Sequence, residues 1–292
     1  MLKFSTSQNC RIAFRCLFTL GIMFSLFFSN AQVHDCGSAP SSIAARQNYG
    51  STWSGSRNDF EVKLNFILNA VGTNVVPANR PQLIINRLTA DFAGTGFSFV
   101  FDPCETQTAP ISLELANGNI TGKCYFENSN RNDIGIDVHV LPDNNLDPSG
   151  YAFGIPSDEI LIKGIQSDGV PASLSSLISH EMGHALGLFH TFQGTCATNS
   201  FTCPDITAPS LTTSDYCGSV DGVVLQDHVG PSCTWNGVSQ CGSITTAPPI
   251  SNFMSYSFHQ CRNMFTDCQI VRMKTLACKV EILSTLQVHN IE

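Results

Sequence analysis

The chain has 292 residues, a formal net charge of −8 at pH 7 and only 13% charged side chains. This length suits one large domain or two tightly packed subdomains, and the acidic balance offers no basic surface for binding nucleic acid. The low charge, with 22 glycines and 14 prolines, is typical of a loop-rich extracellular protein. We therefore expect no nucleic-acid partner.

The first 31 residues have the layout of a secretory signal peptide. Lys3, Arg11 and Arg15 occur without an acid, and an apolar run at residues 16–28 is followed by small residues at 29–31. The run is short for a bilayer span, so we predict cleavage after Ala31, with a membrane anchor as the alternative. No later stretch reaches 18 apolar residues. We expect a secreted product that is free of the membrane after signal removal.

The first half of the remaining chain predicts a mixed sheet. Residues 61–68 alternate between apolar and polar positions, as a half-buried strand does, and residues 79–92 have helical periodicity with Pro81 near their start. Further strand patterns cover residues 97–101, 111–115, 134–141 and 159–164. The sequence thus predicts an α+β fold in which at least one helix covers the sheet.

The next element is a helix over residues 173–186, with Ser173 as its expected N-cap. It carries the start of "HEMGHALGLFH", residues 180–190. His180 and His184 are four residues apart, so they lie on one helix face one turn apart. Gly187 is expected to end the helix in a left-handed turn that brings His190 back as a third ligand.

These residues predict a catalytic zinc site. Three imidazoles suit Zn(II), and three protein ligands leave a fourth position for water. Glu181, one residue from the first ligand, is then placed as the general base that takes a proton from the zinc-bound water, which gives peptide-bond hydrolysis without a covalent intermediate. The alternatives are a histidine-bearing surface helix and a site that only stores or senses metal.

A last helix is expected from residue 266 onward. Thr266 and Gln269 have the spacing of a capping box, and Ile270, Met273 and Leu276 continue an apolar face.

The 13 cysteines indicate disulfides in an oxidising compartment. Cys10 and Cys16 leave with the signal peptide, so 11 remain, an odd number (13 minus 2). Cys104 and Cys124 are 20 residues apart and could pair locally. The last hundred residues hold an even set of disulfide candidates: Cys196, Cys203, Cys217, Cys233, Cys241, Cys261, Cys268 and Cys278. Cys36 is left over, unless it joins a disulfide and another thiol is free.

The stretch "HEMGHALGLFHTF" resembles the extended zinc motif of the metzincin metalloproteases. The stretch "NFMSYS" at residues 252–257, with Met254 64 residues beyond His190 (254 minus 190), resembles their Met-turn. The resemblance implies that Met254 forms an apolar floor beneath the zinc. It also implies that Tyr256 donates a hydrogen bond to the oxyanion.

Within the metzincins the chain resembles the pappalysin-like or cytophagalysin-like family, M43. The zinc motif continues as "HTFQG" to Cys196, and the Met-turn is followed by Cys261, Asn263 and "FTDCQ". The resemblance implies a twisted mixed sheet with an active-site helix and a backing helix, plus an irregular, disulfide-rich C-terminal subdomain that ends in a helix. The expected catalytic subdomains are residues 59–187 and 188–292. The implied function is a secreted zinc endopeptidase that acts on protein or peptide substrates.

Family members often begin their secreted form with a cysteine-glycine pair, which Cys36 and Gly37 resemble. A thiolate would occupy the open zinc position, so residues 32–58 are expected to be a pro-segment that keeps the enzyme latent. Activation would require a cut after this cysteine, for which Arg46 and Arg57 are candidate sites.

Two regions depart from the family. Many members have an aspartate-rich stretch associated with calcium, but here Asp205, Asp215 and Asp221 are scattered, so Ca(II) ligands and ordinary solvated acids are both open readings. After the Met-turn, where metzincins shape the S1′ pocket, the chain has Phe258, His259 and Gln260. No carboxylate there favours a basic substrate residue, and His259 is expected at a pocket rim and not on the metal.

Two other functions are alternatives to a metzincin peptidase. A binding or inhibitory protein on a metalloprotease scaffold should have a damaged zinc motif, which is not seen. A gluzincin-type zinc peptidase takes a distant glutamate as third ligand, whereas Gly187, His190 and the Met-turn favour the metzincin arrangement.

Overall fold

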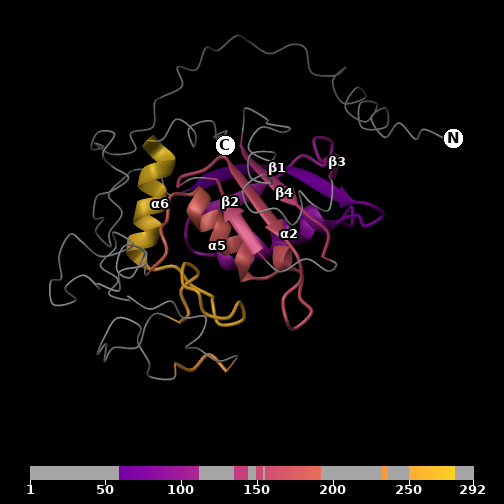
Figure 1. Ribbon diagram of the computed structural model, residues 1–292. Coiled ribbons are helices and arrows are strands. Elements are labelled where there is room, and N and C mark those ends of the chain that lie inside the picture. The colour runs from indigo at the N-terminus through magenta and orange to yellow at the C-terminus, as the bar shows by residue number, and fades with distance from the viewer. Residues whose placement is uncertain are drawn as a thin grey trace, which may run out of the picture.

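The computed structural model describes residues 59–111, 135–143, 149–153, 155–191, 232–235 and 250–279, and the elements below belong to these ranges. In chain order they are β1 (Phe60–Val71), α2 (Arg80–Asp91), β2 (Phe97–Val100), β3 (Gln107–Ile111), β4 (Ile136–Val140), β5 (Ser149–Ala152), β6 (Glu159–Lys163), the 3-10 turn η2 (Ala172–Leu174), α5 (Ser176–Ala185) and α6 (Asp267–Lys279) (Figure 1).

The strands form one mixed sheet in the order β2-β1-β4-β6-β5. The long β1 pairs with β2 through its first residues and with β3 through its last, while its opposite edge pairs with β4, all in parallel. Strand β5 runs antiparallel to β6 and lies at the end of the strand order. The mixed α+β fold expected from the sequence is therefore confirmed for the described residues.

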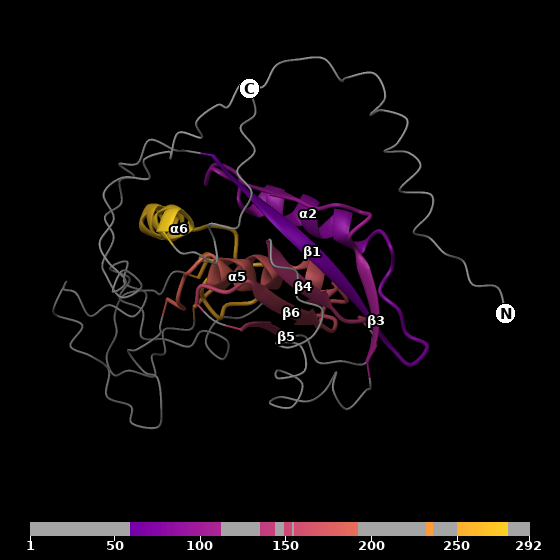
Figure 2. The same cartoon turned by 90° about the horizontal axis from the view of Figure 1, so that it is seen from above.

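Both covering helices pack on the same face of the sheet. Alternate residues of β1, including Val62, Leu64 and Phe66, lie in one buried apolar cluster with Leu88 of α2 and Met182 of α5. In Figure 2, α2 runs along β1, and α5 lies between α6 and β4. This cluster is the main core, and its burial is the largest favourable contribution to folding.

The opposite face of the sheet carries buried polar residues. His139 of β4 and Glu159 of β6 form a hydrogen bond of 2.8 Å between the ring Nε2 and the carboxylate, and the Asn65 amide donates to Asp137 at 3.0 Å. Because side chains alternate across a strand, Ile136, Val138 and Val140 of β4 face the core while these polar residues face away from it.

The structure confirms the predicted strands at 61–68, 97–101, 134–141 and 159–164 and the helix at 79–92, with shifted ends. Most of the strand predicted at 111–115 lies outside the described residues, and β3 ends at Ile111. Strand β5 was not predicted. Its sequence SGYA contains one large hydrophobic side chain, Tyr151, which is exposed, so no burial pattern marks the strand.

The predicted N-cap of the histidine helix was wrong. Ser173 lies in η2, and Ser175 is the cap, because its hydroxyl accepts a hydrogen bond from the Leu177 amide at 3.2 Å. Three serines surround this start, so the sequence offered several caps with similar spacing.

The C-terminal helix has the predicted capping box. The Gln269 amide N–H donates to the Thr266 hydroxyl at 3.2 Å, and the Gln269 side chain accepts from the Thr266 amide at 2.9 Å. Cys261, shortly before this helix, forms a disulfide with Cys233. Cys104 and Cys268 are disulfide-bonded as well. Within the described ranges, no helix combines the length and hydrophobicity needed to cross a membrane.

Candidate metal centre and active-site cleft

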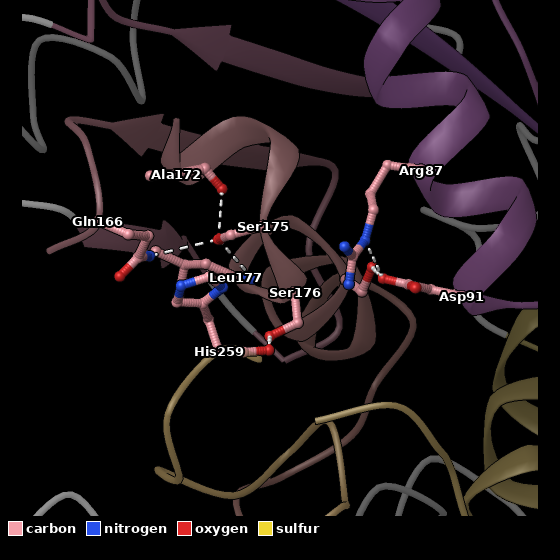
Figure 3. Close-up of polar contacts among 9 residues, drawn as sticks. Arg87, Asp91, Gln166, Ala172, Ser175, Ser176, Leu177 and His259 are labelled. Atoms are coloured by element: carbon pink, nitrogen blue, oxygen red, sulfur yellow. Dashed lines mark hydrogen bonds and ion pairs between the residues drawn. The ribbon is translucent and has the colours of Figure 1, made fainter. Parts of the chain in front are cut away.

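The serine side chains at the start of helix α5 bond to three other parts of the chain (Figure 3). The Ser175 hydroxyl donates to the Ala172 carbonyl at 2.9 Å, and the Ser176 hydroxyl donates to the His259 carbonyl at 2.7 Å. The Ser179 hydroxyl donates to Asp91 of α2 at 2.5 Å. The helix that carries the histidines is therefore held between α2 and the loop after the Met-turn.

Gly187 ends the helix in the expected left-handed conformation, with φ of +96°. Its amide bonds to the His184 carbonyl at 2.8 Å, and the Leu188 amide bonds to the Gly183 carbonyl at 2.8 Å, which turns the chain back. A Cβ at this glycine would also overlap the Leu276 side chain of α6. Both the backbone angle and the close approach of α6 therefore require glycine here.

The turn brings the three histidines together. Their Nε2 atoms are 3.2 Å apart for His180 and His184, 3.0 Å for His184 and His190, and 3.2 Å for His180 and His190. Nitrogens that bind one zinc ion tetrahedrally at about 2.0–2.1 Å are about 3.3 Å apart. Among the described residues, these three form the group of ligand atoms close enough to share a metal ion.

The other ring nitrogens hold the first two imidazoles in place. His180 Nδ1 is 2.7 Å from the Phe253 carbonyl, and His184 Nδ1 is 2.7 Å from the Leu188 carbonyl. A carbonyl only accepts, so each Nδ1 carries the hydrogen and each Nε2 keeps a lone pair for a metal. Burial lowers the pKa of His180 well below its usual value and that of His184 to about 4. Both rings are neutral at pH 7, as a metal ligand requires.

Glu181 lies beside this cluster and is 5% exposed. Burial raises its pKa to about 8, while the Arg262 guanidinium and a hydrogen bond from the backbone of Ala152 act in the opposite direction. A Cβ at Gly150 of β5 would lie 2.5 Å from the Glu181 carboxylate, so this glycine leaves the space that the side chain fills. Strand β5 thus positions the carboxylate from the opposite wall.

Met254 packs directly under the histidine helix. It is fully buried, and a Cβ at Gly183 of α5 would overlap its sulfur. The Asn252 side chain accepts from the Met254 amide at 2.8 Å and exchanges hydrogen bonds with Gln269 of α6. The glycine inside the zinc motif therefore allows the Met-turn to approach, and the C-terminal helix locks the turn in place.

Tyr256 follows two residues later and lies against the third histidine. Its ring centroid is 4.7 Å from that of His190 and 5.8 Å from that of His180. Burial and the nearby Glu181 raise its pKa, so the hydroxyl keeps its proton and can donate a hydrogen bond.

A cavity of about 770 Å³ opens over these side chains. Strand β5 forms one wall, the loop at 256–262 forms another, and the three histidines and Glu181 lie between them. His259 lines the cavity, and its Nε2 is 2.9 Å from the Asp168 carboxylate, which agrees with a place at the rim. The cavity therefore brings together three imidazoles, a buried carboxylate and a phenol.

The sequence interpretation missed Arg262 and β5. Arg262 lines the cavity and is 7% exposed. It comes from a loop with no periodicity, so nothing in the sequence indicated which way its side chain points. The predicted Cys36, Arg46, Arg57, Asp205, Asp215 and Asp221 lie outside the described residues, as do Cys124, Cys196, Cys203, Cys217 and Cys241.

Comparison with known proteins gives a family match over this region. The sequence model of peptidase family M43, described as "Pregnancy-associated plasma protein-A", matches residues 163–277. Extracellular metalloprotease 1 of Coccidioides posadasii is 37% identical over 160 residues, which cover 54% of this chain and 45% of that protein. Human pappalysin-1 is 34% identical over 106 residues, 36% of this chain and 6% of that protein. The chain thus matches less than half the length of these relatives.

Solved structures give a weaker likeness. A point mutant of promirolysin from Tannerella forsythia has 16% sequence identity and a TM-score of 0.48, covering 82% of this chain and 86% of that one. Mature mirolysin in complex with a cleaved peptide has 18% identity and a TM-score of 0.48, covering 79% and 96%.

Proposed function

We propose that the chain is a secreted, zinc-dependent endopeptidase of peptidase family M43, whose sequence model matches residues 163–277. The observation that carries the proposal is the convergence of three imidazole Nε2 atoms, all within 3.2 Å of one another, beside the buried carboxylate of Glu181. Names of relatives that include "extracellular" support the secreted location.

His180, His184 and His190 would hold the metal, and their chemistry fits zinc. All three donors are imidazole nitrogens, and the Nδ1 hydrogen bonds of the first two fix the tautomer that a ligand needs. A bound zinc ion would polarise the scissile carbonyl and make water more acidic. Three protein ligands would leave a fourth coordination position open for water or substrate.

Glu181 is assigned the role of general base. Its carboxylate lines the cavity next to the ligands, so it can accept a proton from the attacking water and pass it to the leaving amine nitrogen. The Arg262 guanidinium and the Ala152 backbone favour the ionised form that this role requires. A nearby divalent cation would act in the same direction.

Tyr256 and β5 are assigned to the substrate. The Tyr256 hydroxyl, kept protonated by its surroundings, would donate to the oxyanion that forms from the scissile carbonyl. Strand β5 lies at the end of the sheet and lines the cavity, so a peptide substrate could bind along it in an extended conformation. Met254 supports the ligand helix from below.

The remaining expectations from the sequence belong to the same proposal. They are a signal peptide at 1–31, a pro-segment at 32–58 with Cys36 as the zinc-blocking thiolate, and catalytic subdomains at 59–187 and 188–292. Latency would appear as peptidase activity that rises after limited proteolysis of the purified chain.

The test is a cleavage-site survey with a peptide library derived from a whole proteome. The full chain, loaded with zinc and assayed before and after limited proteolysis, should cut peptides that Glu181→Gln leaves intact. Both proteins should contain about one zinc per chain by mass spectrometry, which shows that the substituted protein still folds and binds metal. If the zinc-loaded wild type and Glu181→Gln give the same cleavage sites, before and after proteolysis, the proposal is overturned.

A further inference from the structure

Arg262 is a buried cation in the cleft wall that the proposed mechanism does not use on a substrate. It follows Cys261, whose disulfide to Cys233 and amide hydrogen bond to the Phe258 carbonyl at 2.9 Å fix the local backbone. The side chain is 7% exposed and still lines the same cavity as Glu181. A guanidinium is rarely buried without an anion or several acceptors around it.

The protein supplies few partners for this guanidinium. Its Nη1 donates to the Ser255 carbonyl at a long 3.4 Å, and Nε is buried without a hydrogen-bond partner in the part of the chain that the structure describes. None of the ion pairs within the described ranges includes Arg262. The protein therefore uses little of the hydrogen-bonding capacity of this guanidinium, whose side chain lines the cavity.

The charge on Arg262 is retained at neutral pH. Burial lowers its pKa, and Glu181 and Tyr256 raise it, which leaves it at about 10. Glu181 exerts this influence without an ion pair within 4 Å, so it does not cover the guanidinium. The cation is thus available to an anionic group of a ligand.

The surrounding wall favours a negative ligand. Among the described residues that line the cavity, Glu181 is the carboxylate, and His259, Leu177, Phe258 and Gln166 add no negative charge. Asp168 lies outside the lining and is bound by His259. A second cation, Arg87 of α2, lies near enough to lower the pKa of Arg262, but it is paired with Asp91 at 2.7 Å.

We propose that Arg262 selects peptide substrates that carry an aspartate or glutamate side chain next to the scissile bond. The substrate carboxylate would accept charge-assisted hydrogen bonds from the guanidinium in the cleft wall, and such bonds are stronger than those between neutral groups. This inference rests on the proposed peptidase function. It names a class of substrate for the proposed active site. The sequence alone supports one statement about specificity, namely that no carboxylate after the Met-turn favours a basic substrate residue.

The experiment uses pairs of fluorogenic peptides in which one peptide has Glu and the other Gln at a single position. Four positions are tested in turn, the two residues before the scissile bond and the two residues after it. With zinc-loaded wild type, kcat/KM should favour Glu over Gln by about ten-fold or more at one position, as expected for a hydrogen-bonded charge pair. In Arg262→Gln the ratio should fall to near one, and Arg262→Lys should restore part of it.

Arg87→Gln is the matched control, because it removes a neighbouring cation that does not line the cavity, and it should keep the wild-type Glu to Gln ratio. If Arg262 only supports the fold or Glu181, Arg262→Gln should slow both peptides of a pair equally, and that result overturns the inference. A wild-type ratio near one at all four positions does so too, even if the substituted proteins fail to fold. A failure to cut either peptide of any pair counts instead against the peptidase function.

Discussion

Two buried sets of histidine and glutamate side chains lie in different parts of this fold, and they differ in whether the histidine and the glutamate bond to each other. On the polar face of the sheet, His139 and Glu159 bind each other at 2.8 Å, and their side chains are 0% and 1% exposed. In α5, His180 and Glu181 are adjacent in sequence and also buried, but they form no ion pair with each other.

The difference lies in where the polar atoms point. The histidine in the sheet directs its Nε2 to the Glu159 carboxylate, so these two side chains bond to each other. In α5 the Nδ1 atoms bond to backbone carbonyls, the Nε2 atoms converge, and the carboxylate lines the cavity. A buried histidine and a buried glutamate therefore do not identify a functional site by themselves. A functional site is indicated where ring nitrogens and a carboxylate are fixed in position and still face a cavity.

Replacing Glu181 and Glu159 by glutamine should have very different effects on catalysis, and this is the largest difference that we expect. Glu181→Gln should lower kcat/KM by about a thousand-fold, because general-base catalysis contributes about 10²–10⁴-fold. Glu159→Gln should change kcat/KM by less than about three-fold in properly folded protein, because its carboxylate binds His139 inside the sheet. Steady-state kinetics on one peptide substrate measures both, and equal losses would remove the distinction between the groups.

Zinc content should divide the histidines in the same way. His184→Ala removes one of three ligands and should reduce zinc to well below one per chain after dialysis against a weak chelator. His139→Ala should retain the zinc content of the wild type, because the His139 ring lies on the opposite face of the sheet from α5 and its histidines. Mass spectrometry of the dialysed proteins checks this, and a loss of zinc from both variants would contradict it.

The pair in the sheet should matter for stability instead. His139→Leu leaves the Glu159 carboxylate buried without its partner, so the free energy of unfolding should fall by about 3–5 kcal/mol. His259→Leu breaks the pair with Asp168, which is 45% exposed, and should cost about 1 kcal/mol or less. Urea unfolding of the zinc-loaded proteins measures both. Similar losses would show that the buried His139–Glu159 pair contributes no more to stability than the more exposed His259–Asp168 pair.

A smaller effect than that of His139→Leu is expected in the pH dependence of the metal-free chain. Glu181 has a pKa of about 8 when folded and 4.5 as an ordinary carboxyl group, so its contribution to stability is full below pH 4.5 and is lost as the pH rises through 8. Glu181→Gln should therefore gain stability over wild type as the pH is raised from 4.5 to 9. Because the carboxylate lines an open cavity where water eases its ionisation, we expect a gain of about 1–2 kcal/mol in the free energy of unfolding. A difference that stays constant with pH would show that Glu181 does not titrate in this way.

Much of the local structure was readable from the sequence. The alternation in β1, the apolar periodicity of α2, the capping box of α6 and the positive φ of Gly187 all follow from rules that act over a few residues. The spacing of His180 and His184 placed them on one helix face for the same reason. These features depend on backbone geometry, which a short stretch of chain determines by itself.

Features that depend on distant segments came only from the tertiary structure. The choice of Ser175 over Ser173 as N-cap, the edge strand β5 against Glu181, and the inward direction of Arg262 have no pattern in their own neighbourhoods. Each is determined by what packs against it, and those partners lie many residues away. The sequence by itself determined which residues carry the proposed zinc-binding chemistry, while only the fold decided which charges surround them. Burial and distance set the strength of those electrostatic interactions.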